Sequence, residues 1–153
     1  MKLRRKPPEI EKEIRKHLDG ELKERALEFA AWLRANGLAP YGGKIPYKGK
    51  YLCEIRFEPN HWELHFWMCD YSGEYDEGFI KTVQDHLQFC RACHSPCTGG
   101  MDITVFGKEF ANVCSQHTVK IENPDANTLE HIKQMITYWK AVPGSISYHY
   151  NTL

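Results

Sequence analysis

Near the start of the chain, apolar residues recur at mostly three- and four-residue spacing, which predicts an amphipathic helix with one buried stripe. Pro7-Pro8 suits the opening of such a helix, and Asn36-Gly37 supplies a left-handed stop at its end. Asp19-Gly20 is a point at which the helix can divide into two pieces. The expected stripe consists of Ile10, Ile14, Leu18, Leu22, Ala26, Phe29, Ala30 and Leu33.

Two alternating segments follow, at residues 51–57 and 61–69, and each has the period of two that indicates a strand with one buried face. The turn residues between them predict a β-hairpin in which Phe57 lies opposite Trp62. This register assigns the core side to Cys53, Ile55, Phe57, Trp62, Leu64, Phe66 and Met68. It assigns the other side to Glu54, Arg56, Glu63, His65, Trp67 and Cys69.

A second helical spacing begins at about Asp76 and predicts a central helix that delivers Cys90 at its C-terminal end. Its apolar positions are Phe79, Ile80, Val83, Leu87 and Cys90. Residues 102–114 then predict two short strands around a tight turn at Gly107-Lys108. Because the second of these strands runs back along the first, Cys114 is expected to return toward the start of the hairpin.

The end of the chain predicts one more strand, near residues 118–122, and a C-terminal helix capped by Asn123 with Pro124 at its first position. Its apolar face is Leu129, Ile132, Met135, Ile136, Trp139 and Val142, and Pro143-Gly144 ends it. The order of elements predicts an α+β fold, an antiparallel sheet packed with N-terminal, central and C-terminal helices. We expect residues 1–153 to form a single domain, with residues 1–7 as a mobile tail.

Composition narrows the range of partners and locations. Lys and Arg together number 20, as do Asp and Glu, so the chain has no overall charge that would attract nucleic acid or an anionic membrane. No stretch approaches the roughly 20 apolar residues that span a bilayer, and no apolar signal segment follows the basic start. We therefore expect a cytoplasmic protein that binds neither nucleic acid nor membrane. Thiols stay reduced in that compartment.

The candidate chemistry lies in a cluster of cysteines. Cys90 and Cys93 have the Cys-x2-Cys spacing of a metal knuckle, a tight loop whose two thiolates bind one ion. Cys97 adds a third ligand, and the hairpin just described returns Cys114 as the fourth. With four thiolates, the tetrahedral shell of zinc is filled by protein, so residues 90–114 predict a structural zinc site.

Other ligand sets and chemistries compete with this prediction. His86, His94 or His117 could replace Cys97 or Cys114 as a ligand. Cys90 and Cys93 could instead form a reactive thiol pair, although a thioredoxin-like pair opens a helix whereas this one follows a predicted helix. An iron–sulfur cluster is the third alternative, but ferredoxin-type runs place four cysteines at shorter intervals than this segment does.

The polar side of the predicted sheet offers a second, speculative site. Its ligand-binding candidates are Tyr47, Glu54, His65, Trp67 and Tyr71. Glu54 opposite His65 can be drawn as an acid–base dyad, and the aromatic residues as the lining of a small-molecule groove. Packing of the aromatic rings in the core and ordinary ion pairs on a solvated sheet face explain the same residues.

The segment from Cys90 to Pro124, CRACHSPCTGGMDITVFGKEFANVC followed by IENPD, resembles small uncharacterised cysteine-rich proteins of Firmicutes-type bacteria. KIPYKGKYLCEIRF is similar to YdhG-like proteins, and GKEFANV to YjbR-like domains. These resemblances imply a compact bacterial α+β protein and provide no catalytic residue. We expect a zinc-stabilised module that binds an unknown protein or small molecule. The alternatives are a thiol-dependent redox enzyme or sensor using Cys90 and Cys93, and a small-molecule-sensing domain.

Overall fold

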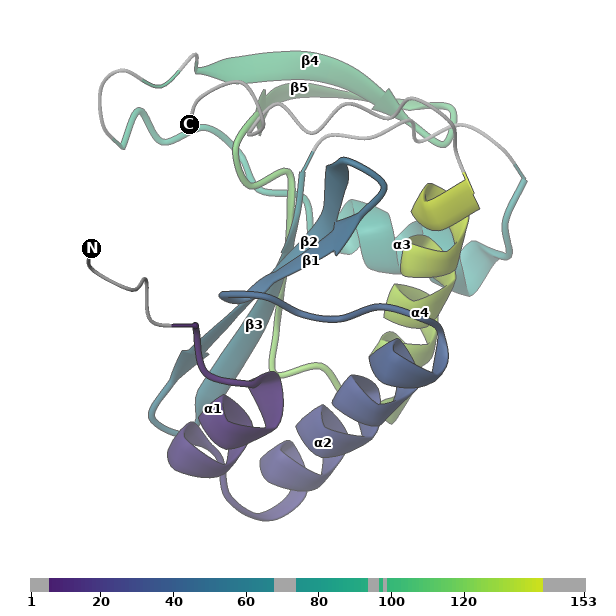
Figure 1. The fold of residues 1–153 in the computed structure, drawn as a ribbon. Helices are drawn as coiled ribbons and strands as arrows, with labels where there is room; N and C mark the ends of the chain where they lie inside the picture. Colours follow the sequence, from purple (N-terminus) through teal and green to yellow (C-terminus); the bar gives the residue numbers. More distant parts are fainter. Residues whose placement is uncertain (1–5, 68–73, 94–96, 98, 142–153) are drawn as a thin grey trace.

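A computed structural model describes residues 6–67, 74–93, 97 and 99–141 (Figure 1). Its helices are α1 Ile10–His17, α2 Gly20–Ala35, α3 Glu77–Asp85 and α4 Ala126–Ala141. Its strands are β1 Lys44–Tyr47, β2 Lys50–Glu58, β3 His61–Phe66, β4 Gly100–Val105, β5 Lys108–Cys114 and β6 Val119–Glu122. The predicted α+β class is therefore confirmed. Of the described helices, none combines the length and hydropathy that a membrane crossing requires.

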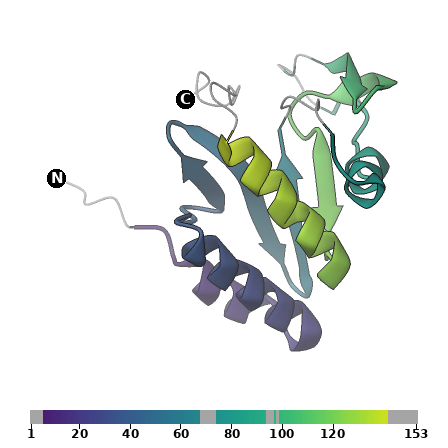
Figure 2. The ribbon, with the colours of Figure 1, turned by 90° about the vertical axis from the view of Figure 1, so that its right-hand side faces the viewer.

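The strands form a four-stranded antiparallel sheet in the order β1-β2-β3-β6 and a separate β4-β5 hairpin. Helix α4 lies across one face of the larger sheet, with α1 and α2 near its lower end (Figure 2). The Phe29 ring of α2 lies 6.1 Å from that of Trp62, and the Trp139 ring of α4 lies 5.1 Å from that of Phe66. We call the opposite face of this sheet, which carries His65, the open face.

The predicted register of the central hairpin is confirmed, because Phe57 pairs with Trp62 and Ile55 with Leu64. A bulge where β1 meets β2 shifts the pairing between Ile45 and Pro46, and both Leu52 and Cys53 are buried there. The sequence analysis did not predict β1, which is short and contains a proline. A turn with positive φ joins it to β2 at residues 48–49.

The predicted division of the first helix is also confirmed, since α1 ends before Asp19-Gly20 and α2 begins there. Gly37 has a φ of +73°, and the next amide, Leu38 N, donates to Leu33 O at 2.9 Å. This 6→1 bond is part of the Schellman arrangement that ends a helix with a left-handed residue. The stop predicted at Asn36-Gly37 is therefore correct.

The central helix is shorter than predicted. Asp76 caps α3 by accepting a hydrogen bond from Phe79 N at 2.8 Å, but the helix ends at Asp85. Leu87 instead pairs with Val119 as an isolated bridge, and Phe89 pairs with Val113. Cys90 therefore follows an extended segment and not a helix, because distant strands provide the backbone partners of residues 86–90.

Two local predictions were wrong by one or two residues. Asp125 caps α4, since its carboxylate accepts from Thr128 N at 2.8 Å, while the side chain of Asn123 bonds to Trp62 N. The second hairpin turns at residues 106–107, both with positive φ, and not at residues 107–108. Several predictions lie wholly or partly outside the described residues, namely those on residues 1–7, Met68, Cys69, Tyr71, His94, Val142 and Pro143-Gly144.

Candidate metal centre and the polar chain beside it

Residues 86–90 connect the two sheets. Gln88 N donates to Thr118 O at 3.0 Å, next to β6, and Gln88 O accepts from Cys114 N at 2.7 Å, at the end of β5. Cys90 N then donates to Asn112 O at 2.8 Å. These backbone bonds fix Cys90 beside the end of β5, close to the point where Cys114 leaves it.

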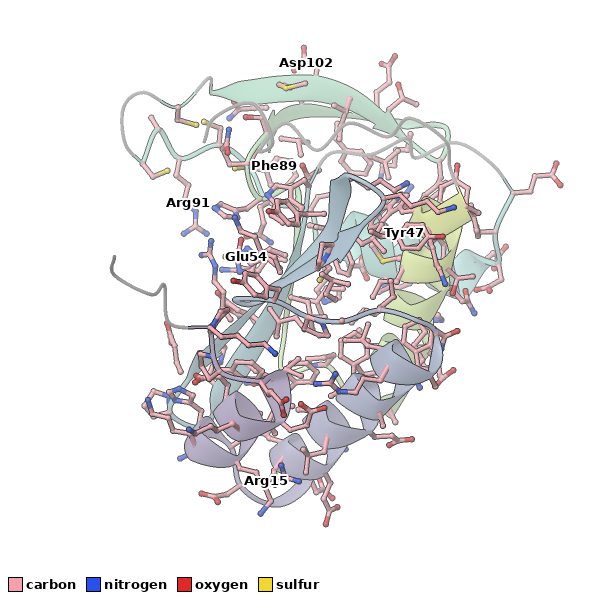
Figure 3. All side chains as sticks on the ribbon, viewed as in Figure 1. Arg15, Tyr47, Glu54, Phe89, Arg91 and Asp102 are labelled. Carbon is pink, nitrogen blue, oxygen red and sulfur yellow. The ribbon has the colours of Figure 1, made fainter. Side chains whose placement is uncertain are left out.

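The start of β4 meets the same point. Gly100 pairs with Cys114, which confirms that the hairpin returns Cys114 to the start of its first strand. A Cβ atom at Gly100 would lie only 2.8 Å from Cys90 Cβ and 2.0 Å from Asn112 Oδ1. Figure 3 shows sulfur atoms gathered at this end of the hairpin, beside the segment that carries Arg91. Glycine is needed here because two other chain segments approach its backbone.

Two cysteine sulfurs accept backbone hydrogen bonds. Gly99 N donates to Cys97 Sγ at 3.5 Å, and His117 N donates to Cys114 Sγ at 3.4 Å. The Ser115 hydroxyl donates to Gly99 O at 3.2 Å and so connects these two loops. N–H groups directed at sulfur stabilise thiolate over thiol, and such bonds surround the sulfurs of cysteine-ligated metal centres.

The exposure of the cysteines differs. Cys93 is exposed, whereas Cys90, Cys97 and Cys114 are half-buried, and none of the four forms a disulfide with a described residue. Ala92, between Cys90 and Cys93, has a φ of +50°, so the loop turns tightly there. No three of these sulfurs lie within 4.8 Å of one another. The backbone of the segment converges, and its ligand set stays a prediction.

Beside this point, the open face carries charged pairs that differ from those predicted. Glu54 lies opposite His65 in the register, as expected. However, His65 Nε2 bonds to Glu63 Oε1 at 2.8 Å, and Glu54 Oε1 accepts from Arg56 Nε at 3.1 Å. Each of these bonds joins neighbours two residues apart on one strand. The predicted Glu54–His65 dyad is therefore replaced by two pairs within strands.

His65 also contacts a second imidazole. Its Nδ1 lies 3.0 Å from Nδ1 of His117, and the His65 side chain is only 3% exposed. Burial lowers the pKa of His65, and the hydrogen bond to Glu63 opposes this shift without cancelling it. Burial opposes ionisation of Glu63, but hydrogen bonds from His65 and His61 outweigh it and lower the pKa of that carboxyl. Neutral His65 therefore faces an ionised Glu63.

These charges fix the positions of the protons. The Glu63 carboxylate only accepts, so Nε2 of neutral His65 carries the hydrogen and its Nδ1 is an acceptor. Nδ1 of His117 must then carry a hydrogen and donate it to His65. A carboxylate, an imidazole and a second imidazole thus form an ordered chain of donors and acceptors.

One group of possible ligands escaped the sequence analysis. Among the described residues, ligand atoms of His61, Glu63 and Glu122 lie within 4.8 Å of one another. Trp62 N donates to Asn123 Oδ1 at 2.9 Å, so the amide presents its NH₂ to His61 Nδ1, 3.2 Å away. Nε2 of His61 then carries the hydrogen and faces Glu63. An imidazole that binds a metal through Nε2 carries its hydrogen on Nδ1 and donates it to an acceptor, whereas Nδ1 of His61 faces an NH₂ donor. This group is therefore a hydrogen-bonded polar cluster and does not fit a metal site.

The remaining ligand-binding candidates do not gather. Figure 3 shows Glu54 to the left of strands β1 and β2 and Tyr47 to their right. The ammonium groups of Lys48 and Lys140 each lie 5.3 Å from the centre of the Tyr47 ring, which places this ring toward α4. Trp67 is buried, with its ring 6.1 Å from that of Tyr51. The structure thus brings together only Glu54 and His65 of the described candidates.

No protein-family model, curated protein or solved structure matches this chain. The class that can be stated for this protein is therefore its fold class. It is an α+β protein in which the cysteine-rich segment lies beside the two-stranded β4-β5 hairpin. His61, Glu63 and Glu122 are the polar residues that the sequence analysis did not consider as a group. Alternation in residues 61–65 could have indicated that His61, Glu63 and His65 share one face.

Proposed function

We propose that this chain is a cytoplasmic binding module stabilised by a structural zinc ion, with Cys90, Cys93, Cys97 and Cys114 as the ligands. The observation that carries the proposal is the convergence of Cys90, Gly100 and Cys114, held by backbone hydrogen bonds of residues 86–90. The N–H groups directed at Cys97 and Cys114 support the thiolate state that zinc requires.

A zinc ion at this point would replace a hydrophobic core that the hairpin lacks. Most positions of β4 and β5 are exposed or only half-buried, and Val105 and Val113 are their buried residues. Four thiolates fill a tetrahedral site and leave no position for substrate, so the ion's role would be to stabilise the fold. Its binding free energy would hold Cys90, Cys93 and Cys97 against the hairpin.

The surface beside the cysteines supports the binding part of the proposal. Phe89 is 51% exposed, and it directly precedes Cys90. Arg91, on the other side of Cys90, is also exposed, and both residues lie on the same side of the molecule in Figure 3. An exposed aromatic next to an arginine is the composition of protein-binding hot spots. We therefore propose a protein as the partner.

The rival function is a redox reaction of the Cys90 and Cys93 thiols. The observation in its favour is the exposure of Cys93, because a reactive thiol must be reached by its substrate. In that case the two thiols would be alkylated rapidly in the native protein, and chelation would not change their rates. A metal-bound set would react slowly until the ion is removed.

Native mass spectrometry of protein purified without added metal, with a count of reactive thiols before and after chelation, separates the two functions. We expect one zinc per chain and four thiols that chelation exposes. Replacing any one of Cys90, Cys93, Cys97 or Cys114 by Ser should reduce both zinc content and stability. Cys53→Ala is the matched control, since Cys53 is buried in the core and should leave zinc content unchanged. Full zinc in Cys97→Ser and Cys114→Ser would refute the ligand set.

A further inference from the structure

A series of hydrogen bonds, joined within His117 by its own covalent bonds, leads from the cysteine segment across the open face. It begins at Cys114 Sγ, which accepts from His117 N, and continues from the His117 ring to His65 and from His65 to Glu63. Glu63 Oε2 then meets His61 Nε2 at 3.3 Å. The chain therefore joins a proposed zinc ligand to groups on β3 that are far away in the sequence.

The part of this chain nearest to Cys114 lies between two strands. Residues 115–118 connect β5 to β6 as irregular backbone. The contacts that hold this segment include the Ser115 hydroxyl on Gly99 O, the His117 ring on His65 and the bond from Gln88 N to Thr118 O. The contact between the His117 ring and His65 therefore helps to set the direction of the His117 backbone N–H. This N–H is the group that bonds to Cys114 Sγ.

We propose that His117 and His65 are positioning residues of the zinc centre. His65, oriented by Glu63, accepts the Nδ1 hydrogen of His117 and so holds the His117 N–H against the thiolate of Cys114. This inference rests on the proposed zinc site and deepens it. It states that side chains on the open face, which are not ligands, set the affinity for the ion, as hydrogen-bond partners around metal ligands do.

Two substitutions at one position separate this role from simple packing. His65→Asn places an amide oxygen near the site of the imidazole Nδ1 and keeps the acceptor toward His117. His65→Gln places an amide NH₂ near the site of Nε2 and keeps the donor toward Glu63, but loses that acceptor. The proposal therefore expects near-normal zinc affinity in His65→Asn and weak affinity in His65→Gln. If His65 only filled space, the zinc affinity would follow the size of the new side chain. His65→Gln would then not bind zinc more weakly than His65→Asn.

The affinity is measured on the full chain by competition for zinc with a chromogenic chelator. We expect a 10- to 100-fold loss of affinity in His65→Gln and His117→Ala, the range found for partners of metal ligands. His17→Phe is the matched control, because the contacts of the His17 ring are with Glu13 and Phe57, outside this chain, and its zinc affinity should stay within about twofold of the wild type. Hydrogen exchange of β2 and β3 in each variant checks that the main sheet is intact.

Cobalt spectra of the same variants distinguish positioning from ligation. Replacing zinc by Co²⁺ gives sulfur-to-metal charge-transfer bands whose intensity follows the number of thiolates. Under the proposal, His117→Ala weakens Co²⁺ binding and leaves the spectrum of four thiolates unchanged at saturation. A wild-type spectrum of three thiolates and one nitrogen that His117→Ala alters would make His117 a ligand and overturn the proposal. Equal affinities in all variants would also overturn it while leaving the four-cysteine site in place, whereas a wild type without metal would refute the zinc site itself.

Discussion

At the scale of single residues, Gly100 is a position of close approach between β4, β5 and the cysteine segment. A methyl group there would lie 2.8 Å from Cys90 Cβ, and this atom moves only with its backbone. We expect Gly100→Ala to lower the free energy of unfolding by about 1–3 kcal/mol, the usual cost of overpacking. Urea denaturation with excess zinc measures the change. Thr104→Ala, an exposed site on the same strand, should change the value by less than about 0.5 kcal/mol. An equal effect of both would contradict the close approach.

His65 makes stability depend on pH in a definite direction. Its folded-state pKa is below the ordinary value of 6.5, so the unfolded chain binds more protons at this site than the folded protein does. The contribution to stability is complete above 6.5 and is lost as the pH falls through the lowered folded pKa. We expect the wild type to lose more unfolding free energy than His65→Phe between pH 7 and pH 5. Urea denaturation of the metal-free protein at both pH values measures this difference, because the proposed zinc affinity itself depends on His65. Parallel pH profiles would show that His65 does not titrate as described.

At the scale of elements, the cap of α4 gives a direct test of the structure against the sequence. The sequence suggested Asn123, whereas the Asp125 carboxylate accepts from Thr128 N. Asp125→Ala should therefore cost about 1 kcal/mol of unfolding free energy, as the loss of an N-cap does. Glu130→Ala removes an exposed carboxylate from the same helix and should cost less than half as much. Thermal unfolding of the two variants provides the comparison, and a larger loss in Glu130→Ala would count against Asp125 as the cap.

The helices and strands that the sequence predicted correctly are those whose formation depends on residues close together in the chain. Apolar spacing and the left-handed stop at Gly37 define the first two helices, and alternation defines the register of Phe57 and Trp62. Leu87 and Cys90 continue the helical spacing of α3, yet their backbone pairs with strands that come 22 to 32 residues later. No local pattern contains such partners. Short β1 was missed for a related reason, because its pairing with β2 outweighs the proline that its sequence contains.

The hydrogen-bonded chain of His117, His65 and Glu63 also could not be predicted in full from local sequence patterns. Alternation placed His65 and Glu54 opposite each other, and the register agrees. Yet His65 Nε2 bonds to Glu63, and its Nδ1 contacts His117, which lies 52 residues away and is outside any local pattern. The cysteine spacing predicted that Cys114 returns to its neighbours, since a hairpin is local. It did not predict that residues 86–90 hold Cys90 in place, because that requires both sheets.

At the scale of the whole molecule, the proposed zinc ion would stabilise one part of the protein more than the other. The four-stranded sheet has a core formed with α1, α2 and α4, whereas the β4-β5 hairpin has few buried side chains. We expect chelation to reduce hydrogen-exchange protection of β4 and β5 by at least about tenfold and to change β2 and β3 much less. Exchange measured before and after chelation, with Cys53→Ala as the control, tests this. Uniform loss of protection would mean that the two parts unfold together.

Residues 86–90 also limit how the length of this protein can change. Successive side chains of an extended segment point to opposite sides, so deleting one residue turns every later side chain over. In an extended segment that pairs with a single strand, such a deletion disturbs the pairing with that strand alone. Here it would disturb the pairing with β6 and the pairing with β5 at once, and would carry Cys90 away from Gly100. Insertions and deletions should therefore be accepted at the Lys48-Gly49 turn long before they are accepted between α3 and the cysteines.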